Sequence, residues 1–174
     1  GGAGFVGANV CIGLAERHPD WDLIAFDNLH RRGSELNLPR LRKAGIRFSV
    51  GYELSDSFRQ AILEPPETAW VPAIEADGQA RDGAWVAELT GRVDLSAWPA
   101  GARLICRRER PHPGAQFQIF DEHGYRHTCF LTDQDGNDIA ALELRHRGRA
   151  RVEDSIRAGK DTGIVRKGEF KISD

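Results

Sequence analysis

The middle of the chain carries short segments in which apolar and polar residues alternate, or apolar residues run together, between turns rich in Gly, Pro and Asp. Alternation with a period of two places successive side chains on opposite faces of a strand. The turns read ADGQARDG, PHPG, DEHG and DQDGND. We therefore expect a mostly antiparallel β unit of about five strands, at Trp70–Ile74, Ala84–Thr90, Ala102–Arg110, Ala115–Asp121 and Arg126–Thr132.

A helical pattern follows this β unit. From Leu144 to Gly163 the chain has no proline, and charged residues recur at helical intervals. If the stretch is a helix, one face carries Arg149, Glu153, Ile156 and Lys160. On spacing alone, Arg149 and Glu153 are typical of a solvated i,i+4 ion pair.

The first 63 residues alternate between helical and extended patterns. An apolar helical pattern follows residue 7 and ends at Pro19. We expect strands at Trp21–Phe26 and Ile46–Val50, and a short amphipathic helix at Ser55–Leu63 that ends at the following prolines.

Glycines recur at the start of the chain as Gly1-x2-Gly4-x2-Gly7, and Asp27 follows Gly7 by 20 residues. Such glycines let a backbone approach a pyrophosphate at a helix N-terminus, and an acid about 20 residues later accepts from a ribose hydroxyl. A tight turn before a helix is the alternative explanation for the glycines. The spacing favours a dinucleotide site.

The segments GGAGFVGANV and AFDNLHRRGSELNL resemble the opening of NAD-dependent sugar-nucleotide epimerases and dehydratases, over about the first 40 residues. The resemblance implies a Rossmann-like fold and NAD as cofactor, bound by Gly1, Gly4, Gly7 and Asp27. The family's catalytic Tyr-x3-Lys is absent, and so is a strand before Gly1. We therefore expect a vestigial site that binds NAD weakly or not at all.

The spacing His146-x2-Arg149-x3-Glu153-x6-Lys160 resembles the Tyr-x2-Arg-x3-Glu-x6-Lys signature of DDE transposases of bacterial insertion sequences, with His in place of Tyr. The segments RARVEDSIRAGKDTG and RFSVGYELSDSFRQAIL are similar to the corresponding segments of transposase DDE group 1. The resemblance is continuous from Tyr52 to about Gly163. It implies that Glu153 is a catalytic, metal-binding carboxylate. It also implies that His146, Arg149 and Lys160 contact DNA.

The chemistry of that family needs two divalent ions, Mg²⁺ or Mn²⁺, held by three carboxylates. This chain supplies Glu153, but no residue in 1–40 resembles the two Asp-bearing motifs expected upstream. We expect a transposase remnant that is not catalytically competent alone. The alternatives are an epimerase fragment, a non-catalytic DNA-binding module and a non-functional fusion reading frame.

Charge and cysteine content narrow the choice of partners. The net charge of -2 excludes a uniformly basic surface, but residues 145–171 hold nine Lys and Arg against four Asp and Glu. We therefore expect weak DNA binding by a local patch. The three cysteines are far apart, and no apolar run reaches membrane-spanning length, so we expect no membrane contact and a cytoplasmic location.

Taken together, these patterns predict an α/β chain of the mixed α+β class. Residues 1–45 would form an incomplete Rossmann-like βα start, and residues 46–174 a truncated RNase H-like transposase fragment. Following the transposase resemblance, we expect a β-rich insertion at about 70–132 and the Glu-bearing helix at about 138–162. Nothing in the sequence indicates an oligomeric state.

Overall fold

The computed structural model describes residues 1–149, apart from 53–55, 112–113, 115–120 and 122. A last helix begins at residue 139 and continues through 149, where the described part of the chain ends. The elements before it are α1 (Phe5–Arg17), β1 (Ile24–Asp27), the 3-10 turn η1 (Ser34–Asn37), α2 (Leu38–Lys43), β2 (Arg47–Tyr52), α3 (Asp56–Leu63), the 3-10 turn η2 (Glu67–Ala69), β3 (Val71–Ile74), β4 (Ala80–Glu88), β5 (Arg103–Glu109) and β6 (Arg126–Thr132).

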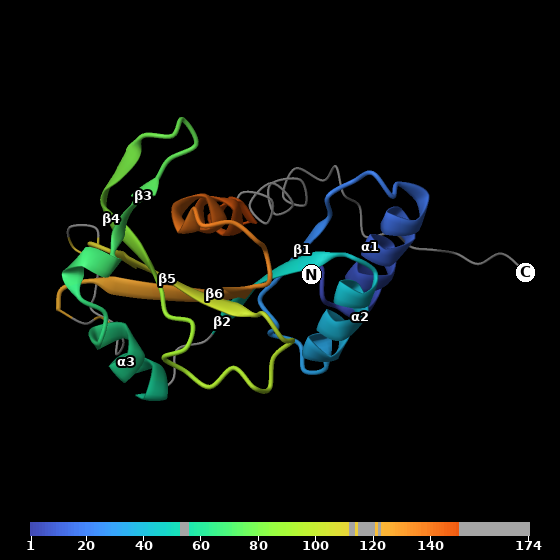
Figure 1. The fold of residues 1–174 in the computed structure, drawn as a ribbon, viewed down its shortest axis with the longest axis horizontal. Helices are drawn as coiled ribbons and strands as arrows, with labels where there is room; N and C mark the ends of the chain where they lie inside the picture. The colour runs from blue at the N-terminus through green and yellow to red at the C-terminus, as the bar shows by residue number, and fades with distance from the viewer. Residues whose placement is uncertain (53–55, 112–113, 115–120, 122, 150–174) are drawn as a thin grey trace, which may run out of the picture.

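The strands form one six-stranded sheet in the order β1-β2-β6-β5-β4-β3 (Figure 1). β1 pairs with β2 in parallel, and the remaining neighbours pair antiparallel. This arrangement confirms the predicted mixed α+β class. The predicted strand at 115–121 falls almost entirely outside the described residues.

The two segments for which we expected different family resemblances share this sheet. β2 lies between β1 and β6. Its residue Ser49 is opposite Phe26 of β1 on one side and opposite Thr132 of β6 on the other. One core cluster also contains residues from both segments, including Ala25 and Leu104. The boundary predicted between residues 45 and 46 therefore separates two adjacent strands of one sheet.

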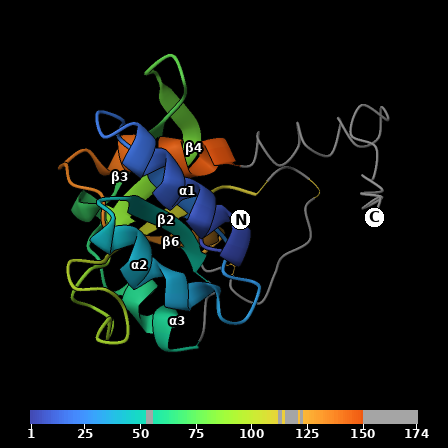
Figure 2. The ribbon, with the colours of Figure 1, turned by 90° about the vertical axis from the view of Figure 1, so that its right-hand side faces the viewer.

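Two apolar layers lie on opposite faces of the sheet, as the strand period requires. Along β5, Leu104 and Cys106 belong to the cluster that includes residues of α1, α2 and α3, whereas Ile105 belongs to a second cluster with Leu142. Helix 139–149 thus covers the face opposite α3 (Figure 1). Figure 2 shows α1 and α2 in front of β2, at the β1 end of the sheet.

Most predicted elements have counterparts, with shifted ends. β1 starts at Ile24, three residues later than expected, because Trp21 is exposed and its ring stacks on His18 at a centroid distance of 4.0 Å. Local stacking thus removes Trp21 from the strand. Within the described residues, no helix is long and apolar enough to cross a membrane.

Candidate functional sites

The glycine-rich segment forms a tight loop before α1. The amide of Gly2 donates to the carbonyl oxygen of Phe26 at 2.8 Å, which places the start of the loop alongside β1. A Cβ atom on Gly7 would lie 2.0 Å from the carbonyl oxygen of Gly1. Because no real Cβ approaches a backbone oxygen so closely, the loop requires glycine at position 7.

Asp27 holds this loop in place. Its Oδ2 atom accepts hydrogen bonds from the amides of Ala3 at 2.9 Å and Gly4 at 3.2 Å, and its Oδ1 atom accepts one from Leu29 at 2.8 Å. Burial raises the pKa of the Asp27 carboxyl, but the hydrogen bonds from Leu29 and Ala3 outweigh it and leave the pKa below its usual range. The carboxylate is therefore charged at neutral pH.

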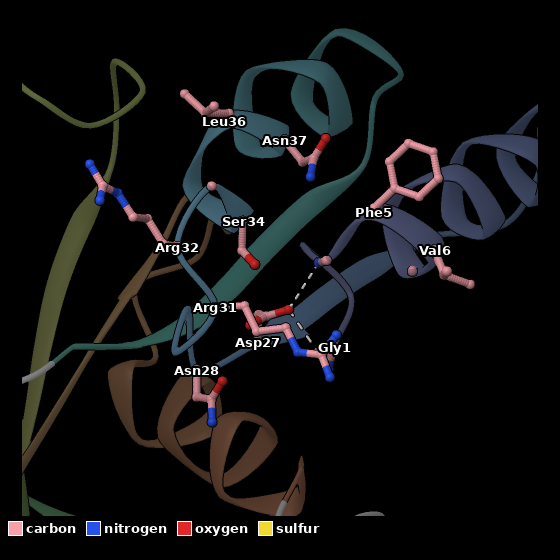
Figure 3. A pocket seen from close by; sticks show the side chains of 13 residues that line it. Gly1, Phe5, Val6, Asp27, Asn28, Arg31, Arg32, Ser34, Leu36 and Asn37 are labelled. Atoms are coloured by element: carbon pink, nitrogen blue, oxygen red, sulfur yellow. Dashed lines mark hydrogen bonds and ion pairs between the residues drawn. The ribbon is translucent and has the colours of Figure 1, made fainter.

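A cavity of about 650 Å³ opens between this loop and the segment that follows β1 (Figure 3). It brings together Gly1, Gly4, Gly7 and Asp27, the four residues that the sequence predicts for a nucleotide site. The backbone at the N-terminus of α1 borders the same space, where amides of the first helical turn have no acceptor within the helix. The volume lies in the range typical of small-molecule sites.

Two cations that are not part of the glycine pattern lie beside this cavity. Arg31 and Arg32 line it together with Asn28 and Ser34, and Figure 3 shows the Arg31 side chain running past Asp27 toward Gly1. Their proximity to the glycine loop follows from the turn after β1. That turn includes Leu29 at a φ of 52°, a conformation that the sequence pattern does not reveal.

The residues present fit a nucleotide only in part. Arg31 and the free amides suit a phosphate group. The Asp27 carboxylate already accepts hydrogen bonds from the amides of Ala3, Gly4 and Leu29, and the Asn28 amide also lowers its pKa, so it keeps little acceptor capacity for a ribose hydroxyl. Such a site could hold a nucleotide, while the sequence lacks the Tyr-x3-Lys pair that hydride chemistry needs.

His146 lies between helix 139–149 and the sheet. Its Nδ1 atom is 2.8 Å from Oγ of Ser49, and its ring stacks on Phe130 at a centroid distance of 4.2 Å and an interplanar angle of 7°. Burial lowers the pKa of His146 to about 3, and the nearby charges of Arg149 and Arg107 act in the same direction. The ring is uncharged at neutral pH, and its predicted contact with DNA stays a prediction.

Arg149 is the second position of the transposase signature, and it lies on the same helix, three residues after His146. Glu153 and Lys160 lie outside the described residues. Within the described part of the chain, no three His, Cys, Asp or Glu side chains gather as a metal site. The predicted Mg²⁺ or Mn²⁺ site at Glu153 therefore stays a prediction.

An ion-pair network that sequence reasoning missed fixes this helix. Glu143 is buried and accepts from Arg107 at 2.8 Å and from Arg147 at 3.3 Å, and Arg147 also donates to Glu75 at 3.1 Å. The i,i+4 spacing of Glu143 and Arg147 was its one signal in the sequence. Arg145 donates to Gln134. Arg145 and Arg147 thus have acceptors within the described part of the chain.

Comparison of the chain with protein-family models, with curated proteins and with solved structures gives no match.

Proposed function

We propose that the chain is a DDE transposase remnant that binds DNA weakly and does not cleave it alone. One observation carries this proposal. The transposase resemblance places a β-rich unit at about 70–132 directly before a helix at about 138–162. In the fold, β3 to β6 occupy residues 71–132 and the helix begins at 139. The order and bounds of the elements thus support the resemblance.

The placement of the helix supports the same proposal. Leu142 is buried, and His146 stacks on Phe130, so one side of the helix packs against the sheet. Arg149 lies about one turn beyond His146 on a helix that continues to the limit of the described residues. A helix that is already held on a sheet need not become ordered before it binds, which lowers the entropic cost of a phosphate contact.

Cleavage is a separate matter. In-line displacement at a phosphodiester needs one ion to activate the nucleophile and a second to stabilise the leaving oxygen. A single carboxylate such as Glu153 leaves most of the coordination sphere of an ion to water. Asp20, Asp22 and Asp27 belong to the other sequence pattern, and Asp27 is engaged with the glycine loop. The proposed function is therefore DNA binding.

Fluorescence anisotropy on a short duplex at several salt concentrations tests this proposal. Non-specific affinity should be measurable at low salt and fall steeply as salt rises, because binding releases counterions. Arg149→Ala with Lys160→Ala should weaken binding about equally on all sequences and flatten the salt slope by up to roughly two units. Glu153→Gln should bind as well as the parent or slightly better.

A matched control is Arg17→Ala with Lys43→Ala, which removes the same charge from two exposed positions on α1 and α2. This control should keep the salt slope of the parent. If the Arg149 and Lys160 double variant instead binds like the parent, the basic face is merely solvated and the proposal fails.

A second candidate function is nucleotide binding by the glycine-loop cavity, as in an epimerase fragment. The observation that favours it is the convergence of Gly1, Gly4, Gly7 and Asp27 on one cavity beside Arg31. NAD should bind weakly, since Asp27 has little acceptor capacity left. Titration calorimetry with NAD measures this directly. Complete absence of binding at millimolar NAD would rule out the second candidate, and micromolar affinity lost in Asp27→Ala would show a fully working site.

A further inference from the structure

Arg108, on β5, lies inside a cage of aromatic rings at the opposite end of the sheet from the glycine loop. Its guanidinium carbon is 4.4 Å from the ring centroid of Trp70, 4.9 Å from that of Tyr125 and 5.2 Å from that of Trp85. The rings of Trp85 and Tyr125 meet edge to face at 5.7 Å. Aromatic faces attract a cation, so the cage fixes the guanidinium in place.

The partner of this buried cation is an exposed acid. Arg108 donates through both terminal nitrogens to the carboxylate of Glu67, at 2.9 Å from Nη1. The Arg108 side chain is 9% exposed, whereas the Glu67 side chain is 78% exposed. Glu67 belongs to the three-residue turn η2. A carboxylate so exposed can move into water, while Arg108 stays charged and is buried among the three rings.

A pocket of about 260 Å³ adjoins the pair, between α3 and the loop before β6. Ile62, Leu63 and Pro65 supply its apolar lining. Its other lining side chains are Glu67, Trp70, Arg108, His123, Tyr125 and His127. Apart from the carboxylate of Glu67, these polar side chains can all act as hydrogen-bond donors.

Arg108 also has a donor left over. Its Nε atom is buried and has no hydrogen-bond acceptor among the described residues. Nε lies outside the fork of Nη1 and Nη2, so a ligand that takes the place of Glu67 leaves this donor as it is. An excess of donors around a fixed cation is the chemistry of an oxyanion site.

We propose that this pocket binds a small oxyanion of the phosphate class, with Arg108 as its main ligand and Glu67 as an internal competitor. The planar guanidinium presents two parallel donors that match two oxygens of a phosphate. In the protein alone, the Glu67 carboxylate occupies this fork. A phosphate that displaces Glu67 gains the same two hydrogen bonds and has further oxygens for His123, His127 and Tyr125.

The test uses the full chain and inorganic phosphate, titrated against chloride at constant ionic strength. Binding is followed by calorimetry and by tryptophan fluorescence, to which the cage residues Trp70 and Trp85 contribute. Glu67→Gln removes the competitor without touching the cage, and it should bind phosphate roughly three- to tenfold more tightly than the parent, in line with the small free energy of exposed ion pairs. Glycerol phosphate in place of inorganic phosphate shows whether an ester is also accepted.

Glu64→Gln is the matched control. It makes the same charge change three residues earlier, at an exposed acid that pairs with Arg92 at 3.4 Å, and it should bind phosphate like the parent. Arg108→Lys keeps the charge but loses the fork, and it should abolish binding. His123→Ala, which removes an exposed donor of the pocket that is not one of the cage rings, should weaken binding if Arg108→Lys does not fold. Equal phosphate affinity in Glu67→Gln and Glu64→Gln, or no saturable binding in either, overturns the proposal.

Discussion

The Oγ atom of Ser49 lies 2.8 Å from the Nδ1 atom of His146, which is 97 residues further along the chain. Ser49 is fully buried in β2, and His146 projects from helix 139–149 onto the same face of the sheet. Because a buried hydroxyl needs a hydrogen-bond partner, this contact fixes the position of the helix on the sheet. Helix 139–149 is thereby tied to β2.

This contact predicts a loss of stability in mild acid. The pKa of His146 is lowered to about 3 in the folded chain. When the pH drops below the unfolded pKa of this residue, the unfolded state binds a proton that the folded state does not, so the free energy of unfolding decreases as the pH is lowered. Between pH 7.5 and pH 5 this residue alone should cost about 2 kcal/mol of unfolding free energy. Urea denaturation at the two pH values measures the difference.

His146→Phe is the companion variant, because it keeps a stacked ring on Phe130 and removes the titrating group. It should be less stable than the parent at pH 7.5, since Ser49 loses its partner. Its further loss of stability on going to pH 5 should be smaller than that of the parent. An unchanged pH dependence in this variant would mean that His146 titrates normally in the folded chain.

The glycine loop gives a prediction with an internal control. Gly7→Ala places a Cβ atom 2.0 Å from the carbonyl oxygen of Gly1, so the start of the loop must move, at a cost of about 1–3 kcal/mol. Gly13→Ala, in the same helix, meets no atom within 4 Å and should stabilise the chain by about 0.5–1 kcal/mol through helix propensity. Thermal unfolding should show a lower melting temperature than the parent for Gly7→Ala and a higher one for Gly13→Ala.

Asp27 should matter for stability as well as for any ligand. Asp27→Ala leaves the amides of Ala3, Gly4 and Leu29 without their acceptor and should cost about 2–4 kcal/mol in urea denaturation. Asp22→Ala, at an exposed position five residues earlier, should change stability by less than about 0.5 kcal/mol. Similar values for the two variants would show that the loop does not depend on Asp27.

The same carboxylate has a predictable pH dependence. Because the pKa of Asp27 is below its usual range in the folded chain, its contribution is present above the unfolded pKa and is lost as pH falls through the folded value. The difference in stability between the parent and Asp27→Ala should therefore narrow below about pH 4. A gap that persists in strong acid would mean that the protonated carboxyl holds the loop equally well.

We expect that the chain does not cleave DNA, and a nicking assay can test this expectation. With Mg²⁺ or Mn²⁺, the chain should neither nick nor join any end sequence, because Glu153 is one carboxylate where three are needed. A supercoiled-plasmid nicking assay with Glu153→Gln as the comparison checks this. Metal-dependent nicking that disappears in Glu153→Gln would contradict the expectation.

The period of apolar and polar positions and the turn residues predicted which helices and strands form better than they predicted where each begins and ends. The strand at 126–132 and the helix at 56–63 lie where the pattern places them, because alternation and prolines act locally. The start of β1 was wrong by three residues, since stacking between Trp21 and His18 competes with strand pairing. Such a contact is not visible in a pattern of apolar and polar positions.

The candidate sites were predictable to different degrees. Glycine spacing named Gly1, Gly4, Gly7 and Asp27, and the cavity brings them together, because a glycine loop before a helix is a local motif. The arrangement of Arg108 among Trp70, Trp85 and Tyr125 joins four segments that are distant in the chain. Alternation along a strand does not reveal which side chains meet across neighbouring strands, so the sequence pattern did not predict this arrangement.

The sequence by itself determined most of the element types, since period and turn chemistry depend on residues close together in the chain, and the two family resemblances stay expectations. Tertiary structure decided that the two segments share one sheet, because β2 can pair with β1 and with β6 at once. It also decided that His146 is buried and uncharged, since the pKa of an imidazole depends on its surroundings. Pairing across a sheet and desolvation are long-range effects, and neither leaves a local pattern in the chain.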